Sequence, residues 1–471
     1  MSIYSSLYSG VSGLTALGNS MSVLGDNIAN VNTTGFKSSR TIFQDILNMT
    51  VTTGNGTSQV GQGVVLGDVS STFAQSGFET TDSETDLAID GNGFFILRNP
   101  NSTENFYSRA GAFTIDSENN LVNSAGLIVQ GRAVDQDTGL AAGSKTDIVL
   151  DKQYINPAET TTIKVYTNLD SKTEKKSEDT VALSERWDGT DDTVDTDAGT
   201  DGKVISETEY SHSSTVKVYD VQGNSHDITI YFDKSTEADA NNVWEYIVTC
   251  NPEEDASKDL EATSGLLDSG TITFTNEGAI SDITSSVSTP SATEPYVSFV
   301  VNFIDQDTAN QQSIEIDFGA AFNGTTWVSD TLASTQFASD SVNMFQSADG
   351  YARGELQSLN IEQNGTINGV YSNGETIPLY QLSLAKFTSQ TNLEKLGGSI
   401  YRETIESGEP VDSAPTTNGL GKVISSTLEQ SNVDIATEFV KMITTQRGYQ
   451  ANSKTIMTTD QMIQTIVNLK R

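Results

Sequence analysis

The stretch IYSSLYSGVSGLTALGNSMSVLGDNIANVN, residues 3–32, decides the fold of this 471-residue chain, because its apolar residues return at steps of three and four. That spacing predicts a helix whose stripe is closer to the repeat of about 3.5 residues of a coiled coil than to that of a lone surface helix. A helix of this length is marginal in water until its stripe is covered. The stripe consists of Leu7, Val11, Leu14, Leu17, Met21, Leu24 and Ile28.

A similar stripe follows Ile435 at the other end of the chain. Because both stripes need a partner, we expect the two ends to pack on each other and on neighbouring copies, so the chain is predicted to polymerise. The second stripe consists of Phe439, Met442, Tyr449, Ile456, Ile463 and Val467.

The first helix is expected to end in the segment Asn30–Lys37. Asparagine side chains compete for the backbone, and a glycine can take the left-handed conformation that turns the chain. A cap and turn would account for this segment alone. Together with the other motifs described below, we interpret it as an assembly junction that includes Asn30, Asn32, Gly35 and Phe36.

The composition leaves little material for catalysis. The chain has one cysteine and two histidines, so it lacks the groups for a disulfide framework, a cysteine metal site or most nucleophilic chemistry. We therefore expect no enzyme and no cofactor, and interpret Cys250 as a small core or surface residue. The chain has no run of about 18 apolar residues, so we expect no membrane-spanning helix. The first residues lack the basic and apolar regions of a Sec-type signal peptide.

The charge is segregated along the chain. Residues 151–340 hold 36 acidic against 10 basic side chains, a balance of −26 within the total of −37. Such a negative field excludes general nucleic-acid binding. The near-neutral ends suit packing inside a homopolymer, and an acidic middle suits a surface that faces water.

The middle of the chain reads as β structure. Residues 87–89 alternate, the cluster Asp90–Gly93 makes a turn, and 94–97 are expected to return as the second strand of a hairpin. Further strands are expected at 112–115, 121–122, 127–130, 214–221, 226–232, 243–249, 271–274, 297–303, 313–318, 358–362, 367–371 and 379–386.

The predicted fold is multidomain α+β, with a terminal α-helical coiled coil and two mainly antiparallel β domains in a nested, discontinuous layout. The inner domain pairs 1–33 with 430–471, and 34–84 is an extended linker. One β domain comprises 85–168 and 341–429, and an acidic outer β domain, 169–340, is inserted into it.

One acidic loop admits another interpretation. Asp195, Asp197, Asp201 and Gly202 suggest calcium, but an EF-hand-like register from Asp197 places Thr208 where a glutamate is needed. A solvated loop is the preferred interpretation of this segment within 188–202.

Five ordered sequence blocks carry a family resemblance. They resemble the signatures of bacterial flagellar rod and hook proteins at both ends of the chain, and five blocks in order are far more specific than one motif. The blocks are SGVSGL (9–14), NIANVNTTGFK (27–37), DLAIDGNGFF (86–95), SRAGAF (108–113) and EFVKMITTQRGYQAN (438–452).

Two further segments distinguish between members of that family. GYARGELQSLNI (350–361) and IPLYQL (377–382) look like the hook subunits, whereas rod subunits are shorter and lack a large insertion. The resemblance therefore implies a structural subunit of the flagellar hook, which polymerises helically into a flexible curved tube that transmits torque from rod to filament.

The resemblance also implies partners and location. These are further copies of the chain, rod subunits, the hook cap, hook–filament junction proteins and the flagellar type III export apparatus, with no nucleic acid and no membrane insertion. The expected location is extracellular, in the hook and basal body of the flagellum, after export without a cleaved signal peptide. A distal rod subunit or an acidic secreted calcium-binding adhesin stays open as an alternative.

Overall fold

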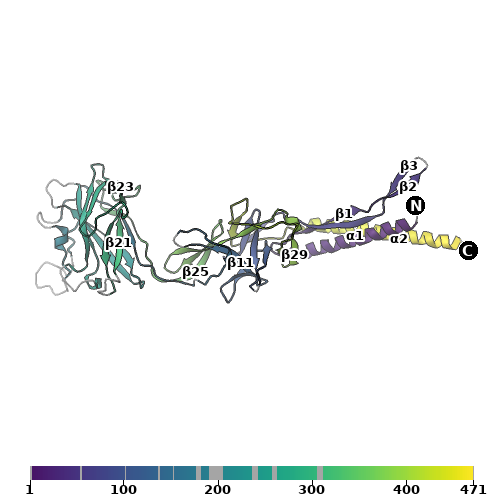
Figure 1. The fold of residues 1–471 in the computed structure, drawn as a ribbon, viewed down its shortest axis with the longest axis horizontal. Coiled ribbons are helices and arrows are strands. Elements are labelled where there is room, and N and C mark those ends of the chain that lie inside the picture. The colour runs from purple at the N-terminus through teal and green to yellow at the C-terminus, as the bar shows by residue number, and fades with distance from the viewer. Residues whose placement is uncertain are drawn as a thin grey trace. The chain divides into compact units, whose positions relative to one another are not determined.

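The structure, a computed structural model, is mostly β-sheet with a long helix at each end of the chain, α1 (Ile3–Ala29) and α2 (Ile435–Leu469) (Figure 1). Neither helix is both long enough and apolar enough to cross a membrane. The described residues are 3–53, 56–100, 102–135, 138–151, 153–176, 182–189, 205–235, 242–256, 263–304 and 311–469.

The chain divides into two compact units. Unit 1 comprises Met1–Gln153, Leu356–Tyr371 and Thr376–Arg471, and unit 2 comprises Tyr154–Glu355 and Ser372–Glu375. Unit 1 therefore contains both helices and a β part, and it is assembled from segments at both ends of the sequence.

The two helices lie side by side and antiparallel (Figure 1). A side chain placed on Gly10 would meet Ile456, in the second half of α2, at 2.9 Å. At the other end of the pair, Asn27 Nδ2 donates to Glu438 Oε2 at 3.1 Å. Both predicted terminal helices are present, and they contact each other within one chain.

The segment 34–84, predicted as an extended linker, is extended but paired. β1 (Ser39–Asp45) and β4 (Val64–Ser71) form an antiparallel hairpin, continued by β2 (Met49–Thr53) and β3 (Gly56–Val60). Its strands lie on α1, where Ser20 Oγ is 3.1 Å from Thr41 Oγ1 and the Val64 amide donates to Ser12 Oγ at 3.2 Å. Serine hydroxyls of α1 thus hydrogen-bond to the hairpin. The glycine-rich composition of 34–84 did not predict that this segment is paired and packed on the helix.

The β part of unit 1 is a branched antiparallel sheet. Strands from the two halves of the sequence share it, in the order β25-β26-β27-β11-β7-β8-β30-β29, with β9, β10, β12, β28 and β31 branching from this path. Their bounds are β7 (Phe94–Arg98), β8 (Asn105–Ser108), β9 (Phe113–Ile115), β10 (Leu121–Asn123), β11 (Ile128–Ala133), β12 (Thr146–Asp147), β25 (Gly354–Ile361), β26 (Thr366–Tyr371), β27 (Thr376–Leu382), β28 (Leu384–Lys386), β29 (Glu394–Gly397), β30 (Ile400–Arg402) and β31 (Val411–Ser413).

Two short ladders join the segment after the hairpin to the segment before α2. β5 (Phe78–Thr80) pairs with β33 (Thr427–Glu429), and β6 (Leu87–Asp90) pairs with β32 (Lys422–Ser425). The predicted hairpin between 87–89 and 94–97 is therefore wrong. The turn between them has positive φ at Gly91 and Gly93, and it moves the chain from the β32 ladder to the main sheet.

Unit 2 contains two larger sheets around one apolar core, and a small hairpin of β22 (Ala320–Phe322) and β23 (Trp327–Ser329). The first is antiparallel, in the order β15-β16-β17-β18-β19, and the second runs β20-β21-β14-β24, with β14 and β21 parallel. Core residues come from both sheets, among them Phe232, Trp244, Phe299 and Ile316. The bounds are β14 (Thr162–Asn168), β15 (His212–Tyr219), β16 (Ser225–Lys234), β17 (Val243–Thr249), β18 (Leu266–Phe274), β19 (Ile280–Ser285), β20 (Val297–Val301), β21 (Gln312–Asp317) and β24 (Val342–Ala348).

The boundaries of this unit differ from the prediction of 169–340. β14 and β24 pair with each other and belong to the second sheet of unit 2 rather than to the sheet of unit 1. The reason is packing, because Ile163 and Val165 on β14 are fully buried in the unit 2 core. The unit consequently begins at Tyr154 and extends to Glu355.

Candidate assembly interface

Small side chains lie where α1 and α2 approach most closely. A Cβ on Gly13 would be 2.6 Å from Asn452 Nδ2, and a Cβ on Gly448 would be 3.2 Å from Leu17 Cδ1. Larger side chains would push the helices apart. The buried positions of α1 within the chain are Gly10, Gly13, Ala16, Ser20, Leu24 and Asn27.

Most of the predicted leucine stripe of α1 is not buried within a single chain. Only Leu24 is buried, at 7% exposure, and Val11 is half-exposed at 50%. The stripe therefore lies beside the α1–α2 contact, and its partly exposed side chains could contact another protein chain. The half-buried members are Leu7, Leu14, Leu17, Met21 and Ile28.

The face of α2 that turns toward α1 differs from the predicted stripe. Phe439 and Tyr449 are exposed, at 47% and 42%, because the contact passes through the neighbouring positions Glu438 and Gly448. Met442, Ile456 and Ile463 are half-buried, as an inward stripe requires, and the side chain of Val467 lies outside the described residues. The inward face comprises Glu438, Met442, Thr445, Gly448, Asn452, Ile456, Thr459 and Ile463.

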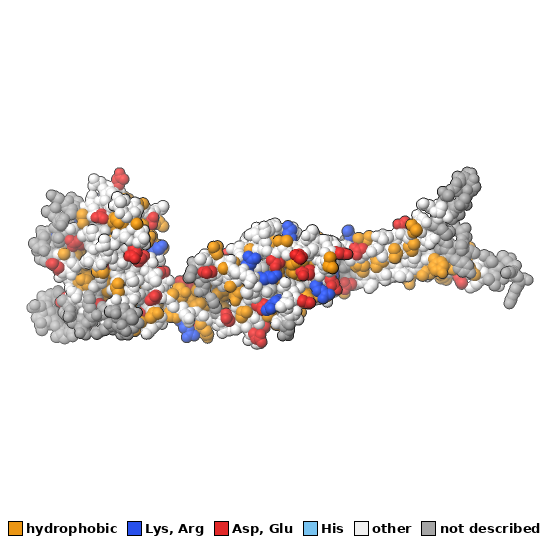
Figure 2. All heavy atoms as spheres, in the orientation of Figure 1, with side chains coloured by type: hydrophobic (Ala, Val, Ile, Leu, Met, Phe, Trp, Pro, Cys, Tyr) orange, Lys and Arg blue, Asp and Glu red, His pale blue; other side chains and the backbone are white. Residues whose placement is uncertain are grey.

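An apolar face of α2 is left open in the single chain. Figure 2 shows hydrophobic side chains gathered on the visible face of the helix pair. Large apolar side chains left exposed in this number on one helix pair indicate an interaction site. Its large members, each at least 46% exposed, are Ile435, Phe439, Val440, Ile443, Met457 and Met462 on α2, with Tyr8 and Val11 on α1.

The predicted junction residues make contacts inside the chain. Asn30 Nδ2 donates to the Asp26 carbonyl and carboxylate at 2.9 and 3.0 Å, which caps the end of α1. Gly35 is buried with φ +66°, while Phe36 is half-buried and Asn32 is exposed. The contact of these residues with another copy stays a prediction.

A buried ion cluster beside this junction was missed by the sequence analysis. Lys37 Nζ donates to Glu429 Oε1 at 2.6 Å, and Arg109 Nη1 lies 3.6 Å from Glu429 Oε2. All three side chains are at most 2% exposed. Burial lowers the pKa of Lys37, although the Glu429 carboxylate opposes that shift, and burial also lowers the pKa of Arg109. The available signal was a lysine and an arginine inside two of the matching sequence blocks, Lys37 in 27–37 and Arg109 in 108–113. Glu429 lies outside the blocks.

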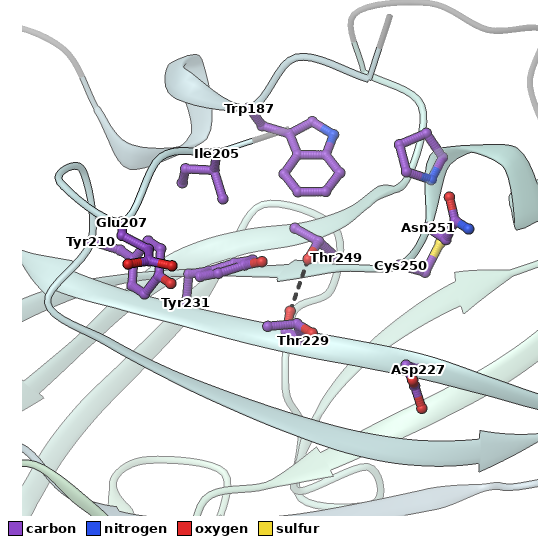
Figure 3. A pocket seen from close by; sticks show the side chains of 11 residues that line it. Trp187, Ile205, Glu207, Tyr210, Asp227, Thr229, Tyr231, Thr249, Cys250 and Asn251 are labelled. Atoms are coloured by element: carbon purple, nitrogen blue, oxygen red, sulfur yellow. Dashed lines mark hydrogen bonds between the residues drawn. The ribbon is translucent and has the colours of Figure 1, made fainter. Parts of the chain in front are cut away.

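Unit 2 contains a separate pocket of about 470 Å³, lined in part by Trp187, Tyr210 and Tyr231 (Figure 3). The Trp187 indole donates to the Ser264 carbonyl at 2.8 Å, and the Thr249 hydroxyl donates to the Thr229 carbonyl at 3.0 Å. These contacts serve packing, and Cys250 at the pocket wall is 3% exposed within the core.

The histidines also have structural contacts. His226 stacks on Phe303 with ring centroids 3.8 Å apart, and its Nδ1 lies 2.7 Å from Glu254 Oε2. His212 Nε2 lies 2.7 Å from Asn343 Oδ1. Among the described residues, no group of three or more histidine, cysteine, aspartate and glutamate side chains is placed to hold a metal ion. The acidic loop considered for calcium, with Asp195, Asp197, Asp201 and Gly202, lies outside those residues.

Four family models match the chain in the order of its parts. They are Flagella basal body rod protein at 7–37, Flagellar hook protein FlgE/F/G D1 domain at 88–168, Flagellar basal body protein FlaE D2 domain at 186–351, and Flagellar basal body rod FlgEFG protein C-terminal at 424–469.

Relatives match along the whole chain. Flagellar hook protein FlgE of Treponema pallidum is 33% identical, with 99% of each chain covered, and that of Borreliella burgdorferi is also 33% identical over 99% of each chain. Flagellar hook protein FlgE of Salmonella typhimurium is 31% identical over 98% of each chain.

Proposed function

The chain belongs to the flagellar hook protein FlgE family, the structural subunits of the hook of the bacterial flagellum, and we propose that it polymerises with copies of itself into a flexible, curved tube that transmits torque from rod to filament. The observation that carries this proposal is the apolar face left open by the α1–α2 pair. Nothing in the described part of the single chain covers that face, so a second copy is its natural partner.

Burial of this face would supply the energy for assembly. Covering one side chain of leucine size contributes about 1.5–3 kcal/mol, and several large apolar side chains of each helix pair are exposed or half-exposed. The proposed arrangement is a coiled-coil-like inner layer in which the half-buried stripe of α1, including Leu14, contacts the helices of neighbouring subunits.

The charge distribution supports an inner and an outer layer. The first 50 residues carry two acidic and two basic side chains, whereas 151–340 carry a net −26. Like charges repeated around an axis repel least when they face water and are screened by salt. In this proposal the nested unit 2 lies outside and makes wet contacts that rearrange as the tube bends, while the helices keep the inside connected.

Export and assembly partners follow from this role. We propose passage through the flagellar type III apparatus without a cleaved signal peptide, and contacts with rod subunits, the hook cap and hook–filament junction proteins outside the cell. The helices, whose stripes are marginal alone, would become fully ordered on assembly.

A charge placed on the open face tests the proposal. Ile443→Asp should block assembly, because an unpaired carboxylate would be buried against the neighbouring copy. Ile443→Val is the matched control, since it keeps an apolar side chain at the same exposed position. Hooks on cells would be counted by electron microscopy after either variant replaces the resident subunit. Normal hooks with Ile443→Asp would contradict the proposal.

A further inference from the structure

We propose that Lys37, Arg109 and Glu429 are positioning residues, which set the direction in which both helices leave the β part of unit 1. The inference rests on the proposed polymerisation and names the residues that make unit 1 a fixed building block. The three side chains form the buried ion cluster already described, which we call the junction triad.

The junction triad connects five separate segments of the chain. Besides Glu429, Lys37 Nζ reaches the Ala74 carbonyl at 2.9 Å, and the Ser76 amide donates to Glu429 Oε1 at 3.2 Å. Arg109 Nη2 donates to the Gly91 carbonyl at 2.8 Å, in the turn between β6 and β7. The cluster therefore ties the residues after α1 and those before α2 to the β sheet.

Backbone contacts around the triad fix the same geometry. The Gly35 amide donates to the Glu429 carbonyl at 2.7 Å, and a side chain on Gly35 would be 2.5 Å from the Ala110 amide nitrogen. Asn432 Oδ1 accepts from the Ser38 amide at 2.7 Å. The entry to α2 is thus hydrogen-bonded to the exit from α1.

The chemistry of the triad argues against a role in stability alone. It buries two cations with one anion, and both Glu429 Oε2 and Arg109 Nε lack a hydrogen-bond partner among the described residues. An incompletely satisfied buried ionic network contributes less to folding than well-packed apolar groups of similar size, because of its desolvation. Its directional bonds instead admit one arrangement of the segments that they join, which is the property a repeating subunit requires.

Two variants and one control test the inference in the full-length chain. Lys37→Met leaves Glu429 and Arg109 as a balanced pair. The triple variant Lys37→Met, Arg109→Met, Glu429→Leu replaces the whole cluster with apolar side chains. Lys422→Met is the control, because it removes an exposed ion pair with Asp90 at the same end of the β part. Each chain would replace the resident hook subunit in cells.

Three readouts separate positioning from folding. These are thermal unfolding of the purified subunit, the amount of exported protein, and the number and helical geometry of hooks in electron micrographs. We expect the triple variant to melt with the wild-type protein, and Lys37→Met to melt lower, because the Glu429 carboxylate and the Ala74 carbonyl lose a donor. Both variants should be exported, with a loss of hooks or a change of helical geometry larger than the fall in melting temperature explains. Lys422→Met should build normal hooks.

Other outcomes overturn the inference. Normal hooks from either triad variant would show that the cluster does not direct the helices. If Lys37→Met lowers the melting temperature and the number of hooks falls only as far as the amount of folded subunit falls, the triad serves stability alone. If the triple variant does not fold, Lys37→Met alone decides. The proposed polymerisation fails separately, if the wild-type chain builds no tube in the same cells.

Discussion

Asn27 donates a hydrogen bond to Glu438 across the ends of the two terminal helices, at 3.1 Å and over 411 positions of sequence. Both residues are buried, and Asn27 also accepts from the Ser39 amide at 2.9 Å and donates to the Ser39 carbonyl at 2.8 Å. One amide side chain thus joins α1, α2 and the start of β1. This three-way contact makes the helix pair and the hairpin parts of one unit.

The first prediction concerns this contact. Asn27→Ala removes a donor from the buried Glu438 carboxylate and leaves the Ser39 backbone unpaired, which should destabilise the helix pair by about 1–3 kcal/mol. Purified hooks should therefore dissociate at a lower temperature, measured by light scattering. Asn19→Ala, at an exposed asparagine of the same helix, is the control and should leave that temperature unchanged. Equal behaviour of the two variants would show that the contact is dispensable.

Leu14→Asp should abolish assembly while leaving both β units folded. Leu14 is half-buried beside the α1–α2 contact, and a carboxylate there would be carried into the interior of the polymer. Circular dichroism of the purified chain checks the folding, and micrographs of cells check the hooks. Leu14→Met is the control, because it keeps an apolar side chain of similar size at the same position. If Leu14→Asp polymerises like the control, the α1 stripe is not an interface.

Gly35→Ala should destabilise unit 1 by about 2–4 kcal/mol, since a side chain adds left-handed strain and a clash. The Cβ would meet the Ala110 amide nitrogen at 2.5 Å, at a residue with φ +66°. Urea unfolding of the purified chain measures the change. Gly18→Ala is the comparison, because no atom lies within 4 Å of its Cβ and alanine favours the helix. A neutral Gly35→Ala would contradict the described junction.

Acid should loosen the start of α2. The Thr437 amide donates to the Asp434 carboxylate at 3.1 Å, and this bond lowers the pKa of Asp434. Because the pKa of Asp434 is lower in the folded state than its unfolded value of about 3.9, the charged carboxylate stabilises the helix fully above about pH 3.9. This stabilisation is lost as the pH falls through the folded-state pKa. Acid dissociation of hooks, followed by scattering below about pH 4, should depend less on pH in Asp434→Asn, which keeps a capping side chain. An unchanged profile would exclude this carboxylate as a contributor.

The elements themselves were largely predictable from local patterns. The steps of three and four predicted both helices, and β17 spans the predicted 243–249. The alternation of apolar residues also located β15 to β18, β20 and β21 of unit 2. Such patterns depend on neighbours within a few residues, which a sequence displays directly.

Contacts between distant segments were not predictable in the same way. A stripe specifies a helical face, but the choice between Phe439 and Glu438 depends on Asn27 of the opposite helix, which bonds to Glu438. The pairing of β6 with β32 joins segments more than 300 residues apart. The turn sequence Asp90–Gly93 carries no information about so distant a partner strand. The assignment of β14 to unit 2 depends on a core that is completed only by Phe299 and Ile316, far along the chain.

The most direct test is a high-resolution cryo-electron microscopy map of the hook built by this chain. The account predicts that α1 and α2 lie antiparallel as the innermost layer, with Phe439 and Ile443 buried against neighbouring subunits. A map with either helix on the outer surface, or with those two side chains facing solvent, would contradict it.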